Sequence, residues 1–267
     1  MKAFSIKTEI EEYTTFEQYA KEAQLGADDL VLCGEHTYQK YIVPLNLDVQ
    51  TLFREKYGKG EPTDAMVNAM LDELRTKTFG RIIAIGGGTV IDIAKAIAVA
   101  GAEDKVDDLY DKVAELKKMH PLVIIPTTCG TGSEVTNISV INRVSKGVKM
   151  GLASDAMLAD KAVLITNMLD SLPYQIFATS SIDAMVHSVE SFLSPNACSI
   201  SQLFSKEALK LILICWKKSV EAGGGDAWKN YAAEFLKASN WAGVGFGYGG
   251  CAAVHACAYP LGSVYHI

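Results

Sequence analysis

The sequence predicts an α/β domain over residues 1–172, followed by an all-α domain over residues 173–267. In the first part, short apolar runs alternate with helix-like stretches, which is typical of a parallel sheet with helices on both faces. After Pro173, apolar residues keep a helical spacing and strand signals become few. A chain of 267 residues also fits two domains of about 150 residues each.

Each expected element has a local signal. Glycine or proline follows the first three apolar runs, and a helix-like stretch begins directly after the glycines of the second. Three glycines, Gly223–Gly225, mark a turn between helices in the second part. The expected strands are Asp29–Cys33, Arg81–Ile85, Leu122–Ile125 and Lys161–Thr166, and the expected helices are Val90–Ala100, Tyr174–Leu193, Ser201–Ala222 and Ala227–Gly243.

Composition restricts the possible partners. The 25 Lys and Arg against 31 Asp and Glu give a net charge of −6, without a basic block, so nucleic acid is not an expected partner. No apolar run approaches the roughly 18 residues of a membrane span, and the acidic start does not resemble a secretory signal. The six cysteines show no zinc-finger spacing, so we expect them to be free thiols. We expect a cytoplasmic protein that binds small molecules.

Two loops predict a nucleotide site. Gly86-Gly87-Gly88-Thr89 separates a strand from a helix, so the backbone can approach a phosphate at a helix N-terminus. The segment 126–134 (PTTCGTGSE) follows the next strand and offers hydroxyls and glycines. Loops at the carboxyl ends of neighbouring parallel strands line the ligand crevice of open α/β sheets. A tight turn without a ligand remains the alternative for the glycines, and Cys129 is expected to be a packing thiol rather than a nucleophile.

The second expected domain contains a group of candidate metal ligands. Asp183 and His187 are four residues apart on an expected helix, which places both side chains on one face. A carboxylate and an imidazole suit a divalent transition metal, and His255 is a further candidate. Each of these histidines, taken alone, is more often structural than a metal ligand.

Four ordered motifs resemble the iron-containing alcohol dehydrogenase family: GGGTVIDIAKA, IPTTCGTGSEVTN, SSIDAMVHSVE and HACAYPLGSVYHI. Within that family, Phe53–Asp64, Ser154-Asp155 and Tyr259 are similar to the subgroup that uses 4-hydroxybutyrate. The resemblance implies a Rossmann-like N-terminal domain and a helical C-terminal domain of dehydroquinate synthase-like architecture. It also implies a metal in the cleft between them, iron first and zinc second, and NAD as cofactor.

The resemblance assigns roles residue by residue. Glu35 matches the acid at the adenosine ribose, which favours NAD over NADP by repelling a 2′-phosphate. Tyr259 stands where many relatives have a histidine near the nicotinamide, and is the candidate catalytic residue. The implied metal ligands are Asp183, His187 and His255, and the implied cofactor contacts are Glu35, Gly86, Gly87, Gly88, Thr89, Asp92, Thr127, Thr128, Gly132, Ser133 and Lys149.

One departure concerns the fourth metal ligand. Family members carry Pro-His-Gly beyond the position of Ile267, and His266 is not its equivalent, so we expect the chain to be part of a longer protein with an incomplete helical domain.

The expected activity is metal-dependent hydride transfer between NAD and a small primary alcohol or aldehyde, first of all 4-hydroxybutyrate and succinate semialdehyde. The expected partner is a small-molecule substrate, and the expected assembly is a homodimer or larger homo-oligomer. Alternatives are other substrates of the family (1,3-propanediol, lactaldehyde or butanol), glycerol dehydrogenase-like zinc chemistry, a dehydroquinate synthase-like lyase, or a dinucleotide-binding protein without catalysis.

Overall fold

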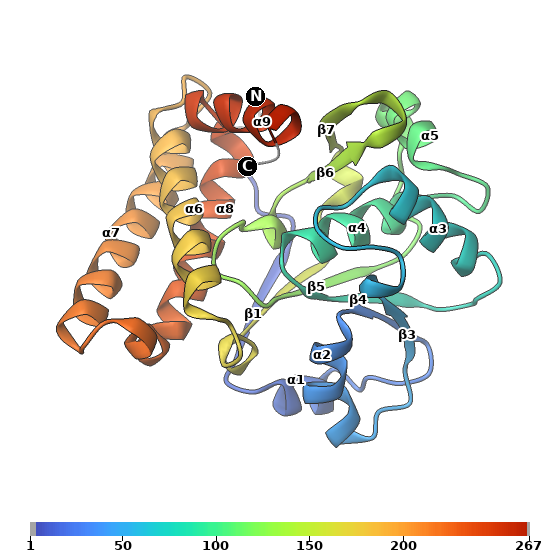
Figure 1. Cartoon of the computed structure of the whole chain (residues 1–267), viewed down its shortest axis with the longest axis horizontal. Helices are drawn as coiled ribbons and strands as arrows, with labels where there is room; N and C mark the ends of the chain where they lie inside the picture. Colours follow the sequence, from blue (N-terminus) through green and yellow to red (C-terminus); the bar gives the residue numbers. More distant parts are fainter. Residues whose placement is uncertain (1–3, 266–267) are drawn as a thin grey trace. The chain divides into compact units, whose positions relative to one another are not determined.

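The computed structural model describes residues 4–265, without the side chains of residues 259–260 and 262–265 (Figure 1). In chain order the strands and helices are β1 (Glu9–Tyr13), α1 (Phe16–Glu22), β2 (Asp29–Cys33), α2 (Glu35–Thr37), β3 (Gln50–Phe53), α3 (Asp64–Leu74), β4 (Arg81–Gly86), α4 (Gly88–Val99), α5 (Val106–Asp111), β5 (Leu122–Pro126), β6 (Ile138–Arg143), β7 (Val148–Ala153), β8 (Lys161–Ile165), α6 (Tyr174–Leu193), α7 (Ser199–Glu221), α8 (Ala232–Gly249) and α9 (Ala253–Tyr265).

The chain forms two compact units. The sheet unit consists of Thr8–Pro126 and Asn137–Val163. The helical unit contains the described residues 4–7, 127–136 and 164–265. The domain boundary expected after residue 172 stays a prediction, while the compact units group the loop 127–136 and residues 164–172 with the helices.

A six-stranded sheet with the order β1-β8-β5-β4-β2-β3 organises the sheet unit. β4 pairs in parallel with β2 and β5, in a register that places Cys33 beside Ile85 and Gly86 beside Pro126. Every residue of β2 and β5 is buried, as in parallel sheets that are covered on both faces. The carboxyl ends of β2 and β4 are therefore neighbours. The chain continues from β2 to β3 on one side and from β4 to β5 on the other side. Open α/β sheets bind ligands beside such a switch in the direction of the connections.

Polar contacts hold the antiparallel β6–β7 hairpin to α4. The backbone N–H of Val140 donates to Asp92 Oδ2 at 3.0 Å, and Ser139 Oγ donates to the Asp92 carbonyl at 2.8 Å. Lys95 is fully buried, and its Nζ donates to the Ile138 carbonyl at 2.8 Å. Two polar side chains of the α4 motif thus have structural partners within the sheet unit.

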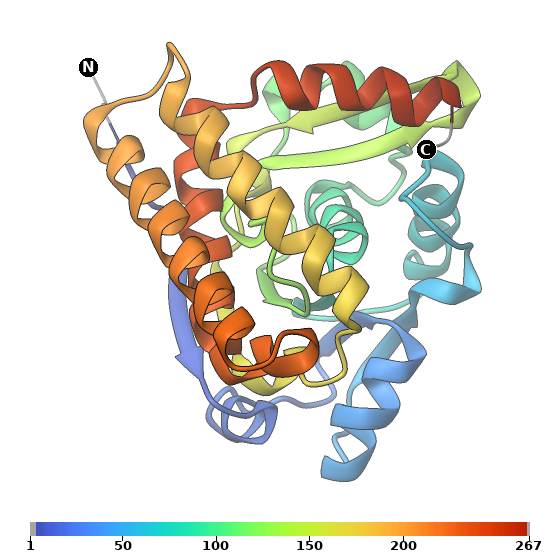
Figure 2. The ribbon, with the colours of Figure 1, turned by 60° about the vertical axis from the view of Figure 1, so that its left-hand side comes forward.

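In the helical unit, α6, α7 and α8 run side by side (Figures 1 and 2). Small residues allow this close approach: a Cβ added at Gly249 would lie 2.7 Å from the Ser191 carbonyl oxygen, and the hydroxyls of Ser191 and Ser205 are 2.7 Å apart. Near the other end of α6, Phe177 stacks on the buried Trp228 with ring centroids 4.0 Å apart. Small side chains and stacked rings therefore set the spacing of the helices.

The expected fold class is confirmed, and all four expected strands are present as β2, β4, β5 and β8. β1 and β3 are additional edge strands, and β6 and β7 form a hairpin that the sequence analysis did not anticipate. The expected helix Ala227–Gly243 starts later, at Ala232, because Gly225–Tyr231 forms a 3-10 turn before α8. Between residues 4 and 265, no helix has both the length and the apolar character to cross a bilayer. The six cysteines, all at described positions, are free thiols.

Candidate metal centre and dinucleotide turn

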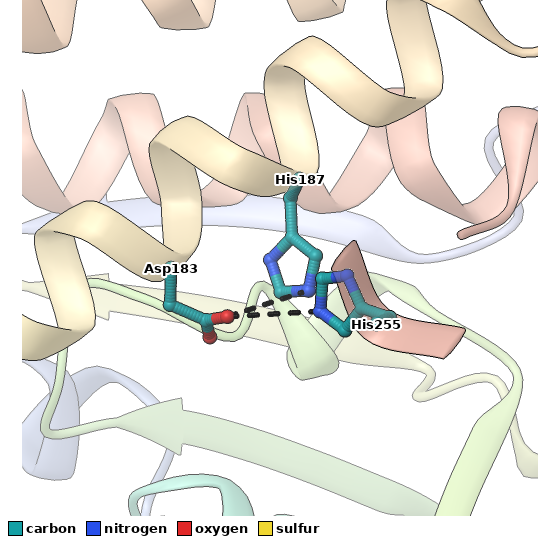
Figure 3. Close-up of side chains that lie close together, drawn as sticks. All are labelled: Asp183, His187 and His255. Atoms are coloured by element: carbon teal, nitrogen blue, oxygen red, sulfur yellow. Dashed lines mark ion pairs between the residues drawn. The ribbon is translucent and has the colours of Figure 1, made fainter. Parts of the chain in front are cut away.

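Three side chains with metal-binding donor atoms converge in the helical unit (Figure 3). Asp183 and His187 project from α6 one turn apart, and His255 comes from α9. Asp183 Oδ1 lies 3.8 Å from His187 Nε2 and 3.7 Å from His255 Nε2. The structure thus brings together the three residues that the sequence analysis selected as metal ligands.

Each histidine is oriented through its second ring nitrogen. His187 Nδ1 lies 3.4 Å from the Gly130 carbonyl oxygen, and His255 Nδ1 contacts the buried Glu190 carboxylate. The other oxygen of Glu190 accepts the backbone N–H of Val254 at 2.6 Å. When Nδ1 carries the proton, Nε2 is left free to bind a metal, and such partners fix the ring in that tautomer.

The sequence analysis missed Glu190 and the Gly130 carbonyl. Glu190 is three residues after His187 on α6, so helical spacing alone could have placed it on the face that carries the ligands. Its contact with His255 depends on how α9 returns to α6, which no local pattern reports. Gly130 acts through its backbone, and residue type carries no signal for that role.

The pKa values reflect these contacts. Burial lowers the pKa of His187, which favours the neutral imidazole that metals bind. The neighbouring carboxylates of Asp183 and Glu190 raise the pKa of His255. Burial acts to raise the pKa values of Asp183 and Glu190, but the nearby His255 lowers both below the usual range. Both carboxylates therefore stay charged at neutral pH.

This donor set fits a divalent transition metal. Two imidazoles and one carboxylate are the ligands of many iron(II) sites, and similar sets occur in catalytic zinc sites. All three donor atoms lie within 4.8 Å of one another. Donors around one ion at about 2.1 Å are separated by about 3 to 4 Å, so the two 3.7–3.8 Å distances need little adjustment.

The glycine turn sits in the sheet unit, between β4 and α4. Gly86 ends the strand, Gly87 is the N-cap of α4, and Gly88 and Thr89 form the first turn of that helix. A Cβ at Gly86 would lie 2.5 Å from Val90 Cβ, so the helix packs too closely for a side chain there. Gly87 provides no side-chain cap, so the first N–H groups of α4 have no acceptor from that residue, as at helix N-termini that can bind phosphate.

Glu35 lies beside the same sheet edge, and a second carboxylate accompanies it. Gly34 follows β2, and Glu35 is the first residue of α2. The backbone N–H of Glu35 donates to Glu55 Oε2 at 3.3 Å. Glu55, which lies directly after β3, was missed as a site candidate because only the parallel pairing of β2 and β3 brings it to Glu35.

Two other expected cofactor residues have protein partners. The Asp92 carboxylate accepts the Val140 N–H described above, and Lys149 Nζ pairs with Glu61 Oε1 at 2.5 Å. Their roles as cofactor contacts stay predictions.

The second expected cofactor loop belongs to the helical unit. Thr127 and Thr128 are half-buried, whereas Gly132 and Ser133 are buried. Cys129 is also buried, and burial raises the pKa of its thiol to about 12, which agrees with a packing role. The side chain of Tyr259, the candidate catalytic residue, and all of His266 lie outside the described part of the structure.

Comparison with known proteins identifies the class. Residues 9–166 match the family described as iron-containing alcohol dehydrogenase, and residues 177–267 match the C-terminal region of the Fe-containing alcohol dehydrogenase family. The chain belongs to the iron-containing alcohol dehydrogenase family.

Among individual relatives, 4-hydroxybutyrate dehydrogenase of Clostridium kluyveri is 40% identical over 267 residues, which cover 100% of this chain and 71% of the relative. Two further curated relatives are spanned only to about half of their length, 49% and 52%. An iron-containing alcohol dehydrogenase from Thermotoga maritima has a TM-score of 0.84 at 28% identity, covering 99% of this chain and 74% of that structure. Sulfoacetaldehyde reductase from Bifidobacterium kashiwanohense, solved in complex with NAD+, has a TM-score of 0.86 at 23% identity, covering 100% of this chain and 72% of that structure, and shares the fold.

Proposed function

We propose that this chain carries the metal and cofactor sites of an NAD-linked oxidoreductase that interconverts a small primary alcohol and its aldehyde. The observation that carries the proposal is the convergence of Asp183, His187 and His255 in one family member. A bound divalent metal, iron first, supplies Lewis acidity to the alcohol oxygen, and a nicotinamide supplies the hydride chemistry.

Residues of the chain would bind and orient the metal and the cofactor. Asp183, His187 and His255 would hold the metal, while Glu190 and the Gly130 carbonyl keep both rings in the binding tautomer. The first turn of α4 would bind the pyrophosphate, with the Gly86-Gly87-Gly88 backbone allowing close approach. Glu35 would accept hydrogen bonds from the adenosine ribose, and Thr127, Thr128, Ser133, Asp92 and Lys149 are proposed as further contacts.

The proposed substrate pair is 4-hydroxybutyrate and succinate semialdehyde. This choice rests on the name of the 40% identical relative and on the similarity of Phe53–Asp64, Ser154-Asp155 and Tyr259 to that subgroup. Family membership favours a dehydrogenase over the lyase alternative. A cytoplasmic location and a homo-oligomeric state remain part of the proposal.

The test is NADH formation from 4-hydroxybutyrate with anaerobic Fe²⁺, before and after chelation, beside propanediol, butanol and NADP. We expect turnover that requires the metal, prefers NAD and is highest with 4-hydroxybutyrate. His187→Ala should lose both bound metal and turnover. Equal turnover by metal-free His187→Ala would refute the metal-dependent reaction, and a clear preference for propanediol or butanol would refute only the substrate.

A further inference from the structure

The loop 127–136 packs against α6 and α8 of the helical unit, and its two glycine positions have no room for a side chain. Gly132 has a φ of +57°, and a Cβ there would lie 2.5 Å from the Cα of Gly243 on α8. A Cβ at Gly130 would lie 2.7 Å from the Ser180 side chain on α6. The loop backbone is therefore closely packed against both helices.

A buried polar pair fastens the same loop. Glu134 and Asn240 are each only 1% exposed, and Asn240 Nδ2 on α8 donates to Glu134 Oε1 at 3.0 Å. Asn240 Oδ1 has no hydrogen-bond partner among the described residues, although an orphaned buried oxygen lowers stability. The hydrogen bond between Asn240 and Glu134 links the loop directly to α8 inside the helical unit.

The fastened loop presents the Gly130 carbonyl to a metal-ligand candidate. That carbonyl lies 3.4 Å from His187 Nδ1, and Glu134 follows it by four residues. We propose that Glu134 and Asn240 are positioning residues, whose buried hydrogen bond holds the Gly130 carbonyl where it fixes the tautomer and orientation of His187. The inference deepens the metal function proposed above and rests on it.

The test compares Co²⁺ binding by the whole chain and four variants. After chelation, Co²⁺ is titrated anaerobically, its dissociation constant is measured by competition with a chelator, and its visible absorption bands are recorded. Glu134→Leu and Asn240→Leu should weaken Co²⁺ binding about 10- to 100-fold, the usual loss on removing an outer partner of a metal-bound histidine, and should shift the bands. Glu134→Gln, which keeps an acceptor oxygen, should bind Co²⁺ within about threefold of the wild type.

Ser205→Ala is the matched control, because it removes a buried hydroxyl contact with Ser191 in the same helical unit but not in the loop. It should lower the melting temperature without changing Co²⁺ affinity. If Glu134→Leu does not fold by circular dichroism, Asn240→Ser takes its place, since it leaves a hydroxyl and space for water.

The outcomes separate the two proposals. Wild-type affinity and bands in folded Glu134→Leu and Asn240→Leu would overturn the positioning role, even if both variants melt earlier. An equal loss in Ser205→Ala would overturn it as well, because the effect would then be general destabilisation. Absence of Co²⁺ binding by the wild type would instead remove the metal site itself, and this inference with it.

Discussion

The two carboxylate oxygens of Glu190 have different partners. One contacts His255, and the other accepts the Val254 N–H at the start of α9. We predict that Glu190→Gln weakens metal binding about 10- to 100-fold, because an amide orients the ring less firmly than a carboxylate does. Isothermal titration calorimetry with Co²⁺ measures the dissociation constant. Glu207→Gln, an exposed acid on α7, should leave the affinity unchanged, and an equal effect in both variants would contradict the prediction.

Glu35 and Glu55 place two carboxylates where a ribose 2′-phosphate would bind if the cofactor site is as proposed. Glu35→Gln should therefore raise kcat/KM for NADP about tenfold relative to NAD, because one repelling charge is removed. Steady-state kinetics with both cofactors measure the ratio. Glu103→Gln, on a highly exposed acid, serves as the control. An unchanged ratio in Glu35→Gln would place the ribose elsewhere.

Residue patterns predicted the three converging side chains better than the groups that orient them. Asp183 and His187 follow from helical spacing, and His255 follows from its residue type together with the family resemblance. Glu55, Glu190 and the Gly130 carbonyl escaped prediction. Each acts through a contact between segments that are distant along the chain, and only the folded backbone establishes such contacts.

Among the elements, the β6–β7 hairpin depends on the buried Asp64 at the start of α3. Its carboxylate accepts the N–H groups of Val144 and Ser145 at 3.1 and 3.2 Å. Burial alone would raise the pKa of Asp64, but these bonds and the Ser145 hydroxyl lower it below its usual value. The carboxylate therefore stabilises the fold above the unfolded pKa of about 3.9, and that contribution is lost as pH falls through the lower folded pKa.

Asp64→Asn should accordingly lower the free energy of unfolding by about 1–3 kcal/mol at pH 7, and the difference from the wild type should shrink below about pH 4. Urea unfolding between pH 3 and pH 7 measures both values. Asp72→Asn, on the exposed face of α3, is the control and should change stability by less than about 0.5 kcal/mol. A pH-independent difference for Asp64→Asn would exclude ionisation as the cause.

The strands that the sequence predicted are almost completely buried, whereas the strands that it missed are only partly buried. β2 and β5 are nearly continuous apolar runs, and such a run predicts a buried strand directly. β1 reads EIEEY with no buried residue, and β3 has only four residues with one buried. Both are edge strands, which need apolar residues on fewer positions. Their place in the sheet follows from pairing with a neighbour rather than from their own composition.

At the scale of the whole molecule, a bound metal should stabilise the folded chain, because the three ligands meet only after α6 and α9 have formed. Saturation to 100 times the dissociation constant corresponds to about 2.7 kcal/mol. Calorimetry should show a lower Tm after chelation and recovery on adding Fe²⁺ or Zn²⁺. His187→Ala should show no recovery, and an equal metal response in both proteins would place the binding elsewhere.

The division into compact units has a consequence for the ancestry and the engineering of such proteins. The backbone passes between the units at residues 7–8, 126–127, 136–137 and 163–164, so neither unit is one uninterrupted stretch of sequence. A single crossover in a gene cannot exchange the helical unit for that of a relative, because the ten-residue loop that carries Gly130 would stay behind. A chimera between two relatives should therefore take the loop 127–136 and the helices of the helical unit from the same parent.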